Sequence, residues 1–171
     1  MNRKIIIVAC LVAILVAVLA YVILSSPPSS SSTVLSVEPQ TVQGTIGQIF
    51  NVTVSISNVT DLYGWQVELS WNPSLLNVTN VVEGPMLKSS GNMTFFSPVV
   101  NNAAGNLSAL CTRLYSFGSN VTGVNGNGTL MTVQFEVIGS GACDLNLYDT
   151  QLLDSNNVAI SHTVQSGHFS T

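Results

Sequence analysis

Hydrophobic and polar side chains alternate strictly from Trp65 to Trp71, with both tryptophans, a valine and a leucine on one side. This period of two is typical of a β-strand with one buried face. Asn72-Pro73 then ends the strand, because proline cannot donate a hydrogen bond to a ladder. Two indole rings on one face exceed what an isolated hairpin needs, so we expect a central strand of a packed sheet with both rings in the core.

Similar alternation recurs along the rest of the chain, and no helical periodicity of useful length appears beyond Val34. The predicted strands cover residues 34–38, 49–57, 64–71, 75–82, 94–100, 105–114, 129–137 and 142–148, with a last pair around 158–160 and 163–170. The glycine- and asparagine-rich stretch 116–128 is predicted to be a loop. About nine short strands predict an all-β domain, a sandwich of jelly-roll type.

The N-terminal segment has a different pattern. Residues 5–24 are apolar, without a charge or a proline, and a helix of that length spans about 30 Å, the thickness of a bilayer core. Arg3 and Lys4 precede this run, so the positive-inside rule predicts a cytoplasmic N-terminus and an extracellular remainder. We therefore expect a single-pass membrane anchor at 1–24, a Ser/Pro-rich linker at 25–33 and a folded domain at 34–171.

Three alternatives to a retained anchor stay open. Val18-Leu19-Ala20 offers small residues for signal cleavage, although the apolar run is long for a signal peptide. Lipidation at Cys10 is a weaker alternative, since only five apolar residues precede this cysteine. The sequence is also compatible with a pilin-like N-terminal helix.

Charge narrows the range of partners. Beyond the apolar run only Lys88 and Arg113 are basic, against eight acidic residues, so the formal charge there is two minus eight, or −6. Such a domain repels phosphates, and we expect no nucleic-acid binding.

Seven asparagines begin an N-x-S/T sequon, whereas Asn72 is excluded by Pro73. The seven are Asn51, Asn58, Asn77, Asn92, Asn106, Asn120 and Asn127. Asn51 and Asn106 fall on the polar side of predicted strands, so these two are expected to face solvent. We predict N-glycosylation of several of the seven in a host with the required enzymes.

Cys111 and Cys143 are the cysteines outside the apolar run, and both fall on the apolar side of predicted strands. In an oxidising compartment a disulfide between them would contribute about 3 kcal/mol through the chain entropy of the closed loop. Two buried free thiols are the alternative. The disulfide is the favoured interpretation.

Candidate catalytic chemistry is sparse, and we expect neither an enzyme nor a cofactor. The pattern places His162 and His168 on one face of a strand, but two histidines without a third ligand make a poor metal site. A Cys-His nucleophile pair would require a free thiol. The aromatic residues left over from the core are candidates for stacking on sugar rings: Tyr63, Tyr115, Phe117 and Tyr148.

The order of several motifs resembles the cohesin domain. These are GQIFNVTV at 47–54, Asn58-Val59, LYGWQ at 62–66, Asn72-Pro73 with Leu75-Leu76, Gly84 to Leu87, Gly123, GNGTL at 126–130 before Phe135, Gly141, Leu152 to Asp154, and Gly167. The similarity covers nearly all of 34–171. It implies a nine-stranded jelly roll related to cellulose-binding modules, without enzymatic activity, and in cellulosomes such domains bind dockerin modules through one sheet face.

Three hypotheses on function follow. The leading one is a membrane-tethered extracellular module that docks a protein partner at the cell envelope, with a dockerin-like module as one candidate. The second is carbohydrate recognition, because of the shared fold and the spare aromatic residues. The third is a glycosylated structural component of the envelope or of a pilus. The single copy and the N-terminal anchor differ from the scaffold arrays of cellulosomes.

Overall fold

The computed structural model describes residues 32–88, 93–114 and 122–171. These residues form ten β-strands: β1 (Thr33–Glu38), β2 (Thr41–Gln43), β3 (Ile49–Ser70), β4 (Leu76–Glu83), β5 (Thr94–Asn101), β6 (Asn106–Arg113), β7 (Val124–Val137), β8 (Ala142–Asp154), β9 (His162–Gln165) and β10 (Gly167–Ser170). No helix long and apolar enough to cross a bilayer occurs in these ranges. The predicted anchor, and the linker as far as Ser31, lie outside them.

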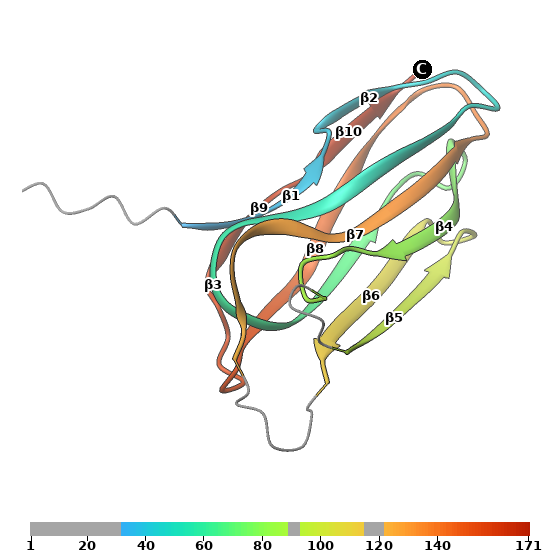
Figure 1. Ribbon diagram of the computed structural model, residues 1–171. Coiled ribbons are helices and arrows are strands. Elements are labelled where there is room, and N and C mark those ends of the chain that lie inside the picture. The colour runs from blue at the N-terminus through green and yellow to red at the C-terminus, as the bar shows by residue number, and fades with distance from the viewer. Residues whose placement is uncertain (1–31, 89–92, 115–121) are drawn as a thin grey trace, which may run out of the picture. The chain divides into compact units, whose positions relative to one another are not determined.

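The strands form two sheets that share one long strand (Figure 1). The first half of β3 pairs with β1 and β7, giving the order β4–β7–β3–β1–β9. The second half pairs with β6 and β8, giving the order β5–β6–β3–β8–β10–β2. The all-β prediction is confirmed, and the arrangement is consistent with a jelly roll.

A bend in β3 transfers the chain from one sheet to the other. Asn58 and Asp61 have φ angles of 55° and 59°, a left-handed conformation that asparagine and aspartate tolerate better than most residues. The backbone amides of these two residues donate to the side-chain oxygens of Asn127 and Asn125, each at 2.7 Å. The prediction of two separate strands at 49–57 and 64–71 is therefore wrong, because these hydrogen bonds keep the bend within one continuous strand.

The core lies between the two sheets, where the alternating side chains face inward. Trp65 and Trp71 are both buried, as predicted. The Trp71 ring meets the Phe135 ring edge-on at 5.3 Å, and Phe50 stacks between Phe135 and Phe169. The indole nitrogen of Trp71 donates to the carbonyl oxygen of Leu76 at 2.8 Å, so the buried polar group has a partner.

Several predicted boundaries are corrected. β7 begins at Val124, within the predicted loop 116–128, because its glycines pair with the bend of β3. β8 continues to Asp154 through an irregularity near Asp149, whose φ is 43°. The short β2 was not predicted, and the segment 163–170 is divided between β9 and β10. His162 and His168 therefore lie on different strands, rather than on one face of a single strand.

Candidate functional site

The outer surface of the sheet β5–β6–β3–β8 is formed by side chains that alternate with the buried ones; we call it the front face. Cross-strand pairing places its residues in four rows: Phe95, Ser97 and Val99 on β5; Thr112, Leu110 and Ser108 on β6; Gly64, Gln66 and Glu68 on β3; Leu153, Gln151 and Tyr148 on β8. Because the strands are hydrogen-bonded neighbours, these rows make one continuous surface.

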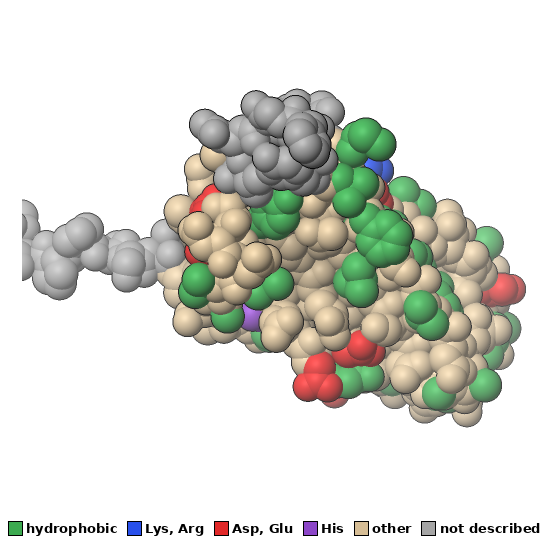
Figure 2. Space-filling model, turned by 90° about the horizontal axis from the view of Figure 1, so that it is seen from below, with side chains coloured by type: hydrophobic (Ala, Val, Ile, Leu, Met, Phe, Trp, Pro, Cys, Tyr) green, Lys and Arg blue, Asp and Glu red, His purple; other side chains and the backbone are tan. Residues whose placement is uncertain are grey.

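Large apolar side chains are unusually exposed on the β5–β6 side of the front face. The exposed fractions are 53% for Phe95, 64% for Val99 and 39% for Leu110. Figure 2, which views the molecule from below Figure 1, shows hydrophobic side chains gathered over this part of the molecule. Glu68 is the single charged residue in the four rows. Contiguous exposed apolar groups of this kind mark interaction sites in soluble domains.

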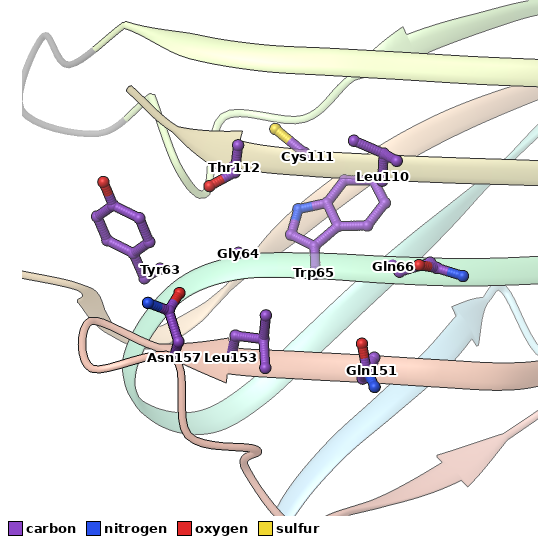
Figure 3. Close-up of a pocket in the computed structure, with 10 residues that line it drawn as sticks. All are labelled: Tyr63, Gly64, Trp65, Gln66, Leu110, Cys111, Thr112, Gln151, Leu153 and Asn157. Atoms are coloured by element: carbon purple, nitrogen blue, oxygen red, sulfur yellow. The ribbon is translucent and has the colours of Figure 1, made fainter. Parts of the chain in front are cut away.

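A pocket of about 170 Å³ opens on the front face. Gly64 forms part of its floor, since this position carries no side chain between Tyr63 and Trp65 (Figure 3). Tyr63 and Asn157 lie at one end of the pocket, and Gln66 and Gln151 lie at the other; the remaining lining residues are Trp65, Leu110, Cys111, Thr112 and Leu153.

The polar groups of this pocket are available to a ligand. Within the described part of the chain, the side chains of Tyr63, Gln66, Gln151 and Asn157 make no hydrogen bond. Each amide side chain offers both a donor and an acceptor. The pocket therefore combines apolar walls with neutral polar groups at its ends, a composition typical of binding sites.

Asp61 holds together the loops beside the pocket. One carboxylate oxygen accepts a hydrogen bond from the Gly123 amide at 2.6 Å, and the other accepts from the Ser155 hydroxyl at 2.6 Å and from the Ser155 amide at 3.3 Å. The Ser155 hydroxyl and then the Gly123 amide lower the pKa of Asp61, against a smaller opposing effect of burial. The turn that carries Asn157 is thereby tied to the bend of β3.

A second polar cluster lies behind β5 and β6. Glu83 accepts hydrogen bonds from the Thr94 hydroxyl at 2.6 Å and the Cys111 thiol at 3.4 Å, and pairs with Lys88 at 2.8 Å. Burial raises the pKa of Glu83, but the hydrogen bonds from Lys88, Thr94 and Cys111 outweigh it, and the net shift is downward. Burial, followed by the Glu83 charge, raises the pKa of Cys111 to about 12. This thiol is therefore a poor nucleophile.

The predicted disulfide is not present: Cys111 and Cys143 are free thiols. Cys111 lies opposite Trp65, which in turn lies opposite Leu152 on β8. Cys143 precedes Leu152 by nine residues (143 to 152), which is about 30 Å along an extended strand. A disulfide requires α-carbons within about 7 Å. The prediction is therefore wrong, because a position on the apolar side of each strand does not bring the two cysteines together.

The four aromatic candidates for sugar stacking do not form one group. Tyr63 lines the pocket, whereas Tyr148 lies opposite Glu68, five residues further along β3, or about 16 Å away. Tyr115 and Phe117 lie outside the described residues. Tyr63 therefore lies at the pocket, Tyr148 has a separate position on the same face, and sugar stacking stays a prediction for both.

The two histidines are also separate. His162 contacts the Thr150 hydroxyl at 2.8 Å, and His168 contacts the Asp144 carboxylate at 2.8 Å. Within residues 32–88, 93–114 and 122–171, no group of three or more potential metal ligands comes together.

Five of the seven sequon asparagines lie in the described ranges, and Asn92 and Asn120 lie outside them. Asn51, Asn58 and Asn127 are exposed, whereas Asn77 and Asn106 are half-buried. The expectation that Asn51 faces solvent is confirmed, and for Asn106 it is met only in part. Asn106 occupies the end of β6 away from the pocket.

Alternation alone did not identify the pocket, because its polar residues come from three separate segments. Gln66 and Gln151 become neighbours through strand pairing, and Asn157 is in a turn. One signal was available in the sequence: residues 94–100 carry apolar side chains on both sides of the strand. In a strand at the edge of a sheet this pattern leaves one apolar side exposed.

The chain is thus a mainly antiparallel β-sandwich, and the front face of one of its sheets is nearly uncharged. Residues 35–170 match the family model described as the cohesin domain. The chain therefore belongs to the cohesin family, as the order of its motifs indicated. The comparison with curated proteins gives no match.

Solved cohesin structures share this fold. A non-cellulosomal cohesin from the archaeon Archaeoglobus fulgidus is 18% identical, with a TM-score of 0.66, and the match covers 81% of this chain and 90% of that one. A type II cohesin domain from the cellulosome of Acetivibrio cellulolyticus is 18% identical, with a TM-score of 0.67 and coverages of 81% and 95%. A chain of a type I cohesin–dockerin complex from Clostridium thermocellum is 16% identical, with a TM-score of 0.66 and coverages of 82% and 99%.

Proposed function

We propose that this protein is a non-catalytic docking module that binds a protein partner through its front face. The observation that carries the proposal is the exposed apolar area formed by Phe95, Val99 and Leu110, which adjoins a pocket with unpaired polar groups. An apolar centre with neutral polar groups around it is the usual composition of a protein–protein interface. Membership of the cohesin family and the solved cohesin–dockerin complex support a dockerin-like module as the partner.

Substitutions on the two outer faces of the sandwich test this proposal. Leu110→Glu places a charge in the middle of the front face, and Thr132→Glu places the same charge on the outer side of β7, in the other sheet. Both positions face outward, so both variants are expected to fold. Purified type I and type II dockerins, and a pull-down from a cell-envelope extract, are the two sources of partner.

We expect Leu110→Glu to abolish capture of a partner that wild type and Thr132→Glu retain. Desolvating an unpaired charge at the centre of an interface costs several kcal/mol, whereas the control charge stays in water. Equal capture by all three proteins would refute docking through the front face.

We also propose that the module is held at the outer surface of the cell membrane. Support comes from the apolar run 5–24, from Arg3 and Lys4 before it, and from the Ser/Pro-rich segment after it. Extraction of membranes at alkaline pH should leave the protein in the pellet. Protease added to intact cells should remove the β-sandwich domain, and a protected domain would contradict the proposed topology.

Carbohydrate recognition is a second candidate, favoured by one feature of the pocket. Tyr63 offers a ring for stacking beside the amides of Gln66, Gln151 and Asn157, and neutral amides suit the hydroxyls of an uncharged sugar. Binding of the wild-type domain to a glycan array, lost in Tyr63→Ala, would support this candidate. An array that stays blank with correctly folded protein would remove it.

A further inference from the structure

The outer surface of the other sheet carries a polar groove. Its volume is about 380 Å³, and it runs along β3 between β1 and β7. Five of its lining residues have hydroxyl or amide side chains: Ser36 on β1, Ser55 and Ser57 on β3, and Asn127 and Thr129 on β7. The remaining lining residues are Glu38, on the β1 side, and Ile56 and Gly128. The groove therefore has the hydrogen-bonding groups of a site for a neutral polyol rather than those of an apolar interface.

Asn127 is oriented in this groove by a single hydrogen bond. Its side-chain oxygen accepts from the backbone amide of Asn58 at 2.7 Å, while its side-chain nitrogen has no hydrogen-bond partner among the described residues. Asn127 is exposed, and with Gly128 and Thr129 it forms a complete sequon. A group attached to the nitrogen would leave the oxygen free to keep its bond to Asn58, so modification does not disturb the bend of β3.

We propose that Asn127 carries an N-linked glycan whose first sugar residues lie along this groove. The donor is an oligosaccharide joined to a lipid pyrophosphate. The side-chain nitrogen of Asn127 attacks carbon 1 of the first sugar, the bond from that carbon to the pyrophosphate oxygen breaks, and the lipid pyrophosphate leaves. The amide proton passes to a base of the transferase, and no atom changes oxidation state.

The groove distinguishes Asn127 from the other sequons. Asn51 and Asn58 are also exposed, but neither lines the groove. Asn77 and Asn106 are half-buried. The hydroxyl of Ser57 has no hydrogen-bond partner in the described part of the chain, and the same holds for Thr129. Hydroxyls of an attached sugar can therefore bond to both without displacing an existing contact.

Mass spectrometry tests whether the site is modified. The full chain is expressed in a host that glycosylates secreted asparagines, and the glycopeptide containing Asn127 is identified. Thr129→Ala removes the sequon but keeps the Asn127 side chain and its bond to Asn58. We expect Asn127 to be occupied in wild type and unmodified in Thr129→Ala, with equal thermal unfolding of the two proteins when both are produced in a host without N-glycosylation. An unmodified Asn127 in a preparation glycosylated at other sequons would overturn the proposal.

Enzymatic release of the glycan tests its position. Under native conditions an amidase that cleaves N-glycans should release the Asn127 glycan about fivefold faster from Ser57→Ala, the factor expected for one net hydrogen bond lost. Thr132→Ala, outside the groove on the same sheet, is the matched control and should behave as wild type. After unfolding, all three proteins should be cleaved at one rate. Equal native rates for wild type and Ser57→Ala would overturn the placement in the groove.

Discussion

The carboxylate of Asp61 allows a quantitative test of how the bend of β3 is held. It accepts short hydrogen bonds from the Gly123 amide and the Ser155 hydroxyl, both at 2.6 Å. A hydrogen bond to a charged group contributes about 1.5–3 kcal/mol. Because Asp61 is only partly buried and water can replace part of each bond, we take the lower end. Asp61→Asn should then lower the free energy of unfolding by about 2 kcal/mol.

The backbone conformation at Asp61 makes a second contribution to the free energy of unfolding. Asparagine tolerates the φ of 59° at this position, whereas alanine there costs a further 1–2 kcal/mol, roughly, in steric strain. Asp61→Ala should therefore lose about 3–4 kcal/mol. Asp149→Asn is the matched control, since Asp149 also has a positive φ but its exposed carboxylate makes no hydrogen bond in the described part of the chain. Its effect should stay within about 0.5 kcal/mol.

Urea unfolding of the domain from Ser32 onward measures these differences, with the fluorescence of the buried Trp65 and Trp71 as the signal. The pKa of Asp61 is lowered in the folded state. Its stabilising effect is therefore fully present above the unfolded-state pKa of about 3.9, and is lost as the pH falls through the folded-state pKa. Asp61→Asn should flatten this acid-side slope. Equal losses in Asp61→Asn and Asp149→Asn would refute the reasoning.

Three further predictions concern the pocket and the core. Gly64→Ala should change the free energy of unfolding by no more than about 0.5 kcal/mol, because the added carbon stays 3.4 Å from its nearest neighbours. The same variant should bind the partner more weakly in a titration, because the methyl group fills the pocket floor. Unchanged affinity would show that the pocket is not part of the interface. Cys111 should resist alkylation at pH 8 in the folded protein, because burial raises its pKa to about 12. After unfolding without reductant, two reactive thiols should be counted beyond residue 32. A count of zero would show that Cys111 and Cys143 form a disulfide. Trp71→Phe should cost about 1–3 kcal/mol in urea unfolding, because the carbonyl of Leu76 loses its buried partner; a neutral effect would contradict the assigned hydrogen bond.

Alternation predicted most of the strands because it reports burial directly. Trp65, Val67 and Leu69 face the core as expected, since a strand with one covered face must place apolar residues at every second position. The period fails where the backbone departs from regular geometry. Residues with positive φ at Asn58, Asp61 and Asp149 shift the register, and a residue-by-residue pattern cannot distinguish a bend within a strand from a break between two strands.

The residues that make up the front face could not be predicted from the sequence pattern alone. Its rows are set by which strands pair, and pairing between β3 and β8 joins residues more than eighty positions apart, such as Gln66 and Gln151. The same limitation produced the disulfide prediction. Cys111 and Cys143 share an apolar environment, but only the order of strands and their registers show that they lie far apart.

The sharing of β3 by both sheets has a mechanical consequence. β1 is bonded on one side to β3, antiparallel, and on the other side to β9, parallel. A pull along β1 from the N-terminal side loads these two ladders in shear, so many hydrogen bonds must break together rather than one after another. The load then passes into β3, which runs directly into the sheet that carries the front face. Tension applied to β1 can therefore reach the front face before the two sheets separate.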